Sequence, residues 1–214
     1  MMIRRSNISG LYDVSGISDV CDTLNCIANV YRITGERQKA LQFYQQSLKR
    51  RVRIVSAMLS DREQASMLLR TYEDVIALLK IEVKECSEKS EMRDQIGKLL
   101  LEMGKLYENR LDRQSKAMMY YQKALEVFKQ MKNYKLIGDT LSFMGVIHVK
   151  RDSNQKALKC FRDSLVLRKM SSKEETADTA ETYHNIGNCE AKLGLFEDCL
   201  HSYCEVSSCI VQRR

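Results

Sequence analysis

The stretch LSFMGVIH at residues 141–148 decides the fold. It has a large apolar residue first, an apolar residue three positions later, a small residue next and a ring three positions after that, which is the spacing of one helix face. Three further stretches follow the same pattern, usually with the final ring: LNCIANVY at 24–31, LLEMGKLY at 100–107 and YHNIGNCE at 183–190. One amphipathic helix therefore recurs four times.

A second motif follows each copy. Twelve or thirteen residues after the small residue stands another small residue, and four positions later an aromatic one. The pairs are Ala40 with Tyr44, Ala117 with Tyr121, Ala157 with Phe161 and Cys199 with Tyr203. Turn-forming residues at 34–35, 111–112, 151–153 and 193–194 separate the two motifs.

This spacing predicts antiparallel helix pairs. The small residues of the first motif, Ala28, Gly104, Gly145 and Gly187, leave room for a second helix to approach closely. We expect the alanine of the second helix to meet them, and the aromatic residue to fill the gap between neighbouring units.

The composition agrees with an all-α chain. The 214 residues contain no proline and nine glycines, so little interrupts a helix. No apolar run reaches the roughly 18 residues of a membrane span, and residues 1–10 lack the apolar core of a secretory signal. The eight cysteines form no CxxC pair. We therefore expect a cytoplasmic protein with reduced cysteines and no membrane contact.

The combined pattern resembles the tetratricopeptide repeat. The intervals of 41 and 42 residues between Gly104, Gly145 and Gly187 resemble the long-period subclass found in kinesin light chains. The resemblance implies a right-handed superhelical α-solenoid of antiparallel helix pairs, as a single array over residues 1–214. We expect units at 18–56, 57–95, 96–136, 137–178 and 179–214. The unit at 57–95 is degenerate, and one long helix from Arg62 to Glu88 is its alternative.

The resemblance also implies a function, that of a scaffold or adaptor which binds a partner peptide or helix in a concave groove lined by the first helices. In the family, groove positions lie six and three residues before the small residue, and one, four and five after it. The candidates carried over are Asn25, Asn29, Arg32, Lys98, Lys105, Asn109, Lys150, His184, Asn188 and Lys192. Asn29 and Asn188 offer a donor and an acceptor to a peptide backbone, and the lysines suit an acidic partner.

Motifs for catalysis are missing. The chain has no GxGxxG, no phosphate loop and no HExxH, so we expect no enzyme activity, cofactor or small-molecule substrate. Cys199, His201 and Cys204 look like metal ligands, but a structural zinc site needs four converging groups, and no second cluster accompanies them.

Two alternative functions stay open. The net charge of +7, and the basic residues Lys49, Arg50, Arg51 and Arg53 at the expected end of a second helix, would suit a nucleic-acid-associated repeat, although 28 acidic residues are interleaved with the basic ones. Alternatively, the chain is a regulatory fragment of a larger signalling or motor-adaptor protein.

The expected last helix, from Phe196 to about Ile210, has an apolar outer stripe and no polar capping helix after it. We expect this uncapped helix to support a weak homodimer.

Overall fold

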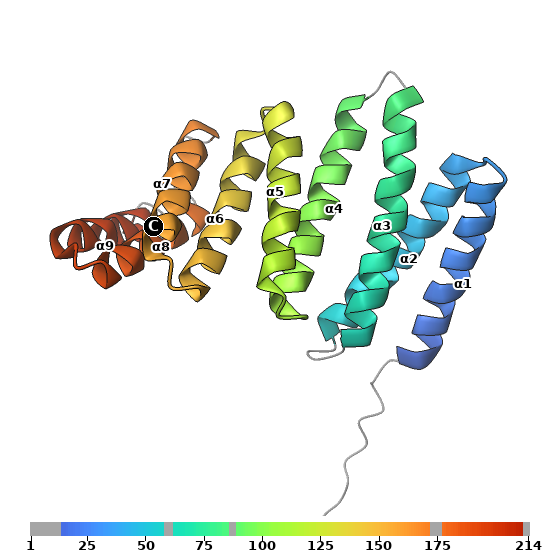
Figure 1. Ribbon diagram of the computed structural model, residues 1–214, viewed down its shortest axis with the longest axis horizontal. Helices are drawn as coiled ribbons and strands as arrows, with labels where there is room; N and C mark the ends of the chain where they lie inside the picture. The colour runs from blue at the N-terminus through green and yellow to red at the C-terminus, as the bar shows by residue number, and fades with distance from the viewer. Residues whose placement is uncertain (1–13, 58–61, 86–88, 172–176, 212–214) are drawn as a thin grey trace, which may run out of the picture. The chain divides into compact units, whose positions relative to one another are not determined.

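The computed structural model describes residues 14–57, 62–85, 89–171 and 177–211, and these ranges consist of α-helices joined by short turns (Figure 1). The helices are α1 (Val14–Ile33), α2 (Arg37–Ala57), α3 (Arg62–Glu85), α4 (Lys89–Asn109), α5 (Gln114–Gln130), α6 (Tyr134–Lys150), α7 (Asn154–Ser171), α8 (Ala177–Lys192) and α9 (Phe196–Val211). They form an N-terminal unit, α1 to α3, and a C-terminal unit, α4 to α9.

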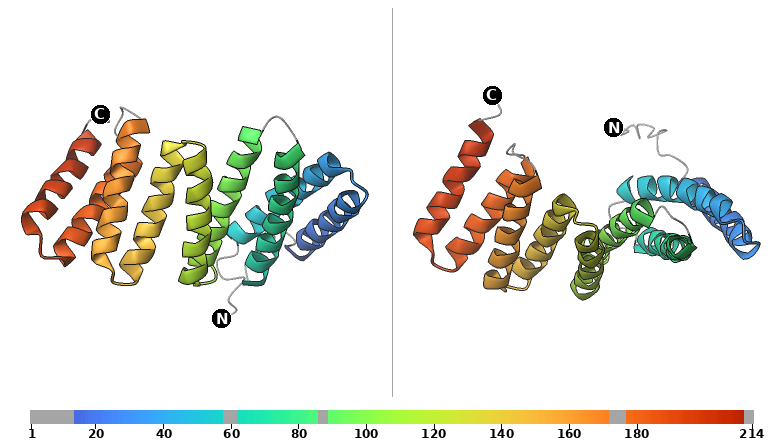
Figure 2. Two further views of the ribbon diagram at one scale, coloured as in Figure 1. Left: turned by 45° about the horizontal axis from the view of Figure 1, so that its top comes forward. Right: turned by 90° about the horizontal axis from the view of Figure 1, so that it is seen from above.

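The helices pack as pairs. The most extensive contacts join α1 with α2, α4 with α5, α6 with α7, and α8 with α9. Within each unit, the second helix of one pair also packs on the first helix that follows, as α5 does on α6, α7 on α8 and α2 on α3 (Figure 2). The fold is the all-α helical-repeat solenoid that the sequence predicts.

A ring lying on a glycine holds each pair of the C-terminal unit together. A Cβ atom at Gly104 would overlap the ring of Tyr121, and one at Gly145 would lie 2.7 Å from Phe161 Cε1. The same relation joins Gly187 to Tyr203. The sequence pattern predicts that the alanine meets the small residue, but the atoms nearest to the glycine are those of the ring of its own pair. The ring also contacts the next unit, as predicted, since Tyr121 stacks on Phe143 of α6. The glycine is needed because the ring occupies the space of a side chain.

The first and second helices of a pair also approach closely at a second place, two turns before the small residue. A Cβ atom at Gly97 would lie 2.5 Å from the ring of Phe128. The carbonyl oxygen of Gly138 accepts a hydrogen bond of 2.7 Å from Ser164 Oγ. In the N-terminal unit, the carbonyl oxygen of Cys21 accepts one of 3.1 Å from Ser47 Oγ. The pairs α4–α5 and α6–α7 are therefore each fixed at two points along their length, which sets the register between the two helices.

Helix α3 has the burial pattern of a first helix without its small residue. Its buried residues Thr71, Tyr72, Val75 and Ile76 have the same spacing as Thr182, Tyr183, Ile186 and Gly187 of α8. Ile76 thus occupies the small position. Within the N-terminal unit, α3 packs on α2, and the described residues of that unit contain no further helix that could serve as its second helix. Because no ring of a second helix packs at Ile76 among these residues, a small residue is not needed there, and the repeat motif is degraded in α3.

Left-handed residues end several helices, at the turns that the sequence predicts. Gly35 and Gly194 follow α1 and α8 with φ of +85° and +75°. Asp152 takes the same place after α6, with φ of +54°. Amide groups beyond each turn donate back to the helix, as Ser153 N does to His148 O at 2.9 Å. These tight turns bring each second helix directly onto the first.

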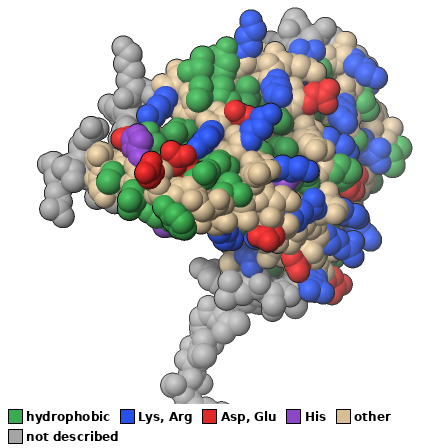
Figure 3. Space-filling model, turned by 60° about the vertical axis from the view of Figure 1, so that its left-hand side comes forward, with side chains coloured by type: hydrophobic (Ala, Val, Ile, Leu, Met, Phe, Trp, Pro, Cys, Tyr) green, Lys and Arg blue, Asp and Glu red, His purple; other side chains and the backbone are tan. Residues whose placement is uncertain are grey.

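The basic run at residues 49–53 does not end a helix, because α2 continues to Ala57. Arg51 is buried and forms an ion pair with Asp22 of α1. The prediction that this basic run ends a helix is therefore wrong. The buried Arg51 also interrupts the basic surface patch that the run would otherwise form. On the face shown in Figure 3, lysine and arginine side chains are scattered among acidic and hydrophobic ones.

The contact between ring and glycine predicts the effect of one added methyl group. Gly104→Ala improves helix propensity, yet we expect it to lower the free energy of unfolding by about 1–3 kcal/mol, because the methyl group overlaps Tyr121. Urea unfolding followed by circular dichroism measures the change. Gly138→Ala is the matched control, because its nearest neighbours lie at 3.3 Å and we expect a smaller effect. A Gly104→Ala protein more stable than the wild type would contradict this packing.

The turn between α5 and α6 predicts a stabilising substitution. Lys132 has φ of +55°, just beyond the end of α5. We expect Lys132→Gly to raise the free energy of unfolding by roughly 0.5–1 kcal/mol, because relief of the left-handed strain exceeds the extra freedom of glycine in the unfolded chain. Lys129→Gly, in the last turn of the same helix, should instead destabilise by about 1 kcal/mol. Thermal melts of both variants test this; equal shifts would refute it.

Candidate functional site

A groove of about 350 Å³ opens on the C-terminal unit, lined by three successive first helices and one residue of α7. We call it the α4–α6–α8 groove. Its lining residues are Lys98, Leu101, Glu102 and Lys105 of α4; Leu136, Asp139, Ser142, Phe143 and Val146 of α6; Arg168 of α7; and Asp178, Glu181, Thr182 and Asn185 of α8.

The repeat explains why these residues meet. Three first helices present the same face, so equivalent positions line the groove in turn. Seven lining residues stand at positions that the family resemblance implies: six before the small residue (Lys98, Asp139, Glu181), three before it (Leu101, Ser142) or one after it (Lys105, Val146).

Three further first-helix positions, which the family resemblance does not include, also line the groove. The position two residues before the small residue holds Glu102, Phe143 and Asn185. The position nine before it holds Leu136 and Asp178, and the position five before it holds Thr182. Helical geometry is the signal that could have found them. Positions nine, six and two before the small residue are separated by three and four residues, so they share one face of the helix.

The apolar floor of the groove is held in place from behind. Leu101 is buried, and Leu136, Phe143 and Val146 are half-buried. The ring of Phe143 stacks on that of Tyr121 with centroids 5.7 Å apart. Lys105 Nζ lies 4.8 Å from the centre of the Phe143 ring, within cation–π range. The ring is therefore fixed before any partner arrives.

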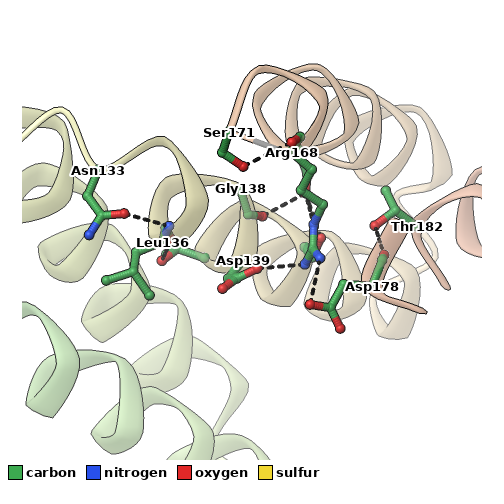
Figure 4. A network of polar contacts seen from close by, with 11 residues as sticks. Asn133, Leu136, Gly138, Asp139, Arg168, Ser171, Asp178 and Thr182 are labelled. Carbon is green, nitrogen blue, oxygen red and sulfur yellow. Dashed lines mark hydrogen bonds and ion pairs between the residues drawn. The ribbon is translucent and has the colours of Figure 1, made fainter. Parts of the chain in front are cut away.

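Arg168 connects the three helices α6, α7 and α8 at the groove (Figure 4). Its Nη2 lies 2.8 Å from Asp139 Oδ1, and its Nη1 lies 3.3 Å from Asp178 Oδ2. Burial raises the pKa of the Asp139 carboxyl, and the Arg168 guanidinium opposes that shift. Arg168 Nε also donates to Ser164 Oγ, at 3.3 Å. One largely buried guanidinium thus fixes two carboxylates that line the groove.

Local caps position the neighbouring residues in the same view. Asn133 Oδ1 accepts a hydrogen bond of 3.2 Å from the amide of Leu136, which caps the start of α6 (Figure 4). Near the start of α8, Thr182 Oγ1 donates to the carbonyl oxygen of Asp178 at 2.7 Å. The helix ends that carry Leu136 and Asp178 are therefore ordered by side chains of their own segments.

Charges on the walls of the groove nearly balance, with three basic and four acidic side chains. On α4, Lys98 pairs with Asp94 at 2.5 Å and Lys105 with Glu102 at 2.8 Å. On α8, Glu181 and Asn185 make no hydrogen bond or ion pair with the described residues. The groove thus offers a partner one carboxylate and one amide that no other described residue engages.

Of the ten residues predicted from the sequence, Lys98 and Lys105 line this groove. Three others, Asn25, Asn29 and Arg32, belong to α1 of the N-terminal unit. Asn29 Oδ1 accepts hydrogen bonds from Tyr44 Oη at 2.8 Å and Arg32 Nη2 at 3.2 Å. Asn25 Nδ2 donates to Thr71 Oγ1 at 2.9 Å. These side chains are engaged in contacts within their own unit.

The remaining five lie on the C-terminal unit, outside the groove lining. Asn188 Oδ1 accepts a hydrogen bond of 2.7 Å from Tyr203 Oη, just as Asn29 does from Tyr44. Lys150 Nζ donates to the buried Glu108 Oε1 at 2.6 Å, and Glu108 Oε2 also accepts from Tyr121 Oη. The other three, Asn109, His184 and Lys192, are exposed. Asparagine after the small residue therefore has a structural role, as the acceptor for the tyrosine of its own pair.

Other kinds of site find no support in the part of the chain that the structure describes. No three metal-ligating side chains gather there; Cys199 is buried and Cys204 exposed. Within the same ranges, no helix is both long and apolar enough to cross a bilayer.

Comparisons with known proteins agree with this geometry. Residues 20–61, which span most of α1 and α2, match the family model of the tetratricopeptide repeat. Curated protein sequences gave no match. Among solved structures, BtubC (BKLC) from P. vanneervenii is similar, with a TM-score of 0.54 and 15% identity over 94% of this chain and 84% of that one.

A Podosopora anserina protein of kinesin light chain type, with nearly identical TPR-like repeats, gives a TM-score of 0.55. Its identity is 11%, over 92% of this chain and 98% of that one. At such identities the likeness shows the fold. Together with the tetratricopeptide repeat matched at residues 20–61 and the recurring contact between ring and small residue, it shows that the chain has the helical-repeat fold of tetratricopeptide repeat proteins.

Proposed function

We propose that this chain is a protein-interaction scaffold whose C-terminal unit binds an extended peptide segment of a partner protein in the α4–α6–α8 groove. The observation that carries the proposal is the groove itself, with its apolar floor and its unengaged polar groups. Its volume lies near the lower limit for small-molecule pockets, and it runs across three helices. Such a shape suits a few side chains of an extended chain.

The rigidity of the groove supports the proposal. Phe143 is held between Tyr121 and Lys105, and Arg168 holds two carboxylates in place. A site fixed in advance loses little conformational freedom on binding, so even a short segment gains affinity. Asn185 adds a donor and an acceptor that a peptide backbone can use whatever its sequence.

The hypothesis of an acidic partner, which the sequence suggests, depends on Lys98 and Lys105. Both lysines are paired with carboxylates of their own helix. The nucleic-acid alternative rests on the basic run of α2, in which Arg51 is buried. No feature of the groove favours an acidic partner or a nucleic acid, whereas the apolar floor of the groove favours a peptide.

Panning a phage-displayed library of random 12-residue peptides tests the proposal. We expect the wild type to enrich peptides that Asn185→Tyr fails to retain, because the added ring fills the groove. Val166→Tyr is the matched control on the exposed side of α7 and should retain them. Enrichment that is equal for all three proteins, or absent for the wild type, would refute groove binding.

The two asparagines of α8 separate the groove site proposed here from the site predicted from the sequence. Asn185→Ala removes an unengaged amide at the groove, and we expect weaker binding of a selected peptide with unchanged thermal stability. Asn188→Ala removes the acceptor of Tyr203, and we expect lower stability, by about 1 kcal/mol, with little effect on binding. Fluorescence anisotropy and thermal melts measure the two effects. If Asn188→Ala weakened peptide binding and Asn185→Ala did not, the peptide would lie on the Asn188 side of α8.

Self-association through α9 stays a prediction. Leu200 is 67% exposed, whereas Leu158 at the equivalent place on α7 is buried in the cluster that packs α7 on α8. We expect Leu200→Glu to lower the weight-average mass of the protein at high micromolar concentration in sedimentation equilibrium. A wild type that stays monomeric throughout would contradict it.

A further inference from the structure

The two outer walls of the groove differ in how their charges are compensated. On the α4 wall, each lysine has a carboxylate of its own helix within 2.8 Å. On the α8 wall, two carboxylates lie one turn apart, at Asp178 and Glu181, and the side chain of Asp178 is 56% exposed. Glu181 is exposed and pairs with none of the described residues.

Arg168 does not cancel this negative wall. Its shorter contact, 2.8 Å, is with Asp139 of α6, and the contact with Asp178 is 3.3 Å. One guanidinium therefore serves two carboxylates, while none of the described residues compensates the charge of Glu181. The negative charge of the groove is concentrated on α8.

From this asymmetry, and resting on the function proposed above, we infer that the bound segment is basic and apolar. An apolar side chain of the partner lies on the floor at Phe143, and a lysine or arginine lies between Asp178 and Glu181 on α8.

The spacing suits a single cation. Side chains three residues apart on a helix have Cβ atoms roughly 5–6 Å apart, so one ammonium or guanidinium reaches both carboxylates. Charge-assisted hydrogen bonds to two carboxylates then fix the direction of the peptide, with its basic residue toward α8. An acidic residue at the same place would face Glu181 and Asp178 together, and at the other wall it would compete with Asp94 and Glu102 for the lysines.

The same 12-residue phage library tests this inference separately from the function. We expect peptides selected on the wild type to be enriched in lysine and arginine over aspartate and glutamate, next to an apolar residue. For a selected peptide with one lysine, Glu181→Lys should weaken binding by about tenfold through like-charge repulsion. Glu197→Lys, an exposed residue of α9 outside the groove, makes the same change in net charge and should leave binding unaltered.

A charge exchange completes the test. Replacing the peptide lysine with glutamate should weaken binding to the wild type and restore binding to Glu181→Lys, which a purely structural role of Glu181 would not produce. Thermal melts check that both variants fold. Groove-dependent peptides enriched in acidic residues would overturn the inference and leave the proposed function standing. A library that yields no groove-dependent peptide would overturn the proposed function, and the inference with it.

Discussion

The structure depends on an aromatic ring that occupies the space of a missing side chain. Four glycines of the C-terminal unit, Gly97, Gly104, Gly145 and Gly187, pack against rings of their own second helices, and the chain can bring the backbones this close only where Cβ is absent. Packing at this density leaves the two helices of a pair no freedom to slide past each other, because a shift of one residue would put a side chain against the ring. The contact therefore fixes register, and register decides which residues of each first helix face outward.

The groove follows from that register. Because successive first helices are held alike, positions two, six and nine before the glycine recur side by side and form one continuous surface. The ring also reaches this surface directly, since Tyr121 packs on Gly104 from one side and stacks on Phe143 of the next pair. A substitution in the contact between ring and glycine is thus expected to disturb the floor of the groove as well as the stability of the pair.

The sequence predicted the fold well because the ring contact constrains residue types. A glycine, an alanine and an aromatic residue at fixed intervals are visible without a structure, and so are the turns at Gly35 and Gly194. Helix α3 shows the limit. The described residues of its unit contain no second helix for it, so no ring requires a small residue at Ile76, and the motif that reveals the place of the other first helices is lost.

The site was harder to predict than the fold, because a groove position is not constrained in residue type. The family positions predict Lys98 and Lys105, which line the candidate groove, but they do not include Asn185 and Phe143, which line it too. The amide groups of Asn29 and Asn188 suggest peptide contacts in the sequence, yet a tyrosine hydroxyl of the second helix already engages each of them. Whether a polar side chain is free for a partner depends on groups 15 residues away in the chain, and only the folded pair shows this.

Charge compensation follows the same rule. The lysines of α4 look like a site for anions in the sequence, and their own helix supplies the carboxylates that neutralise them one turn away. Arg168, by contrast, comes from a second helix and divides its charge between α6 and α8. The net charge of +7 therefore does not predict the charge of the groove. Among the described residues, the groove carboxylate without a partner is that of Glu181, and it is negative. The chemistry of a repeat surface is set by which charges remain after neighbouring helices have paired theirs, so a basic protein can carry a groove that selects cations.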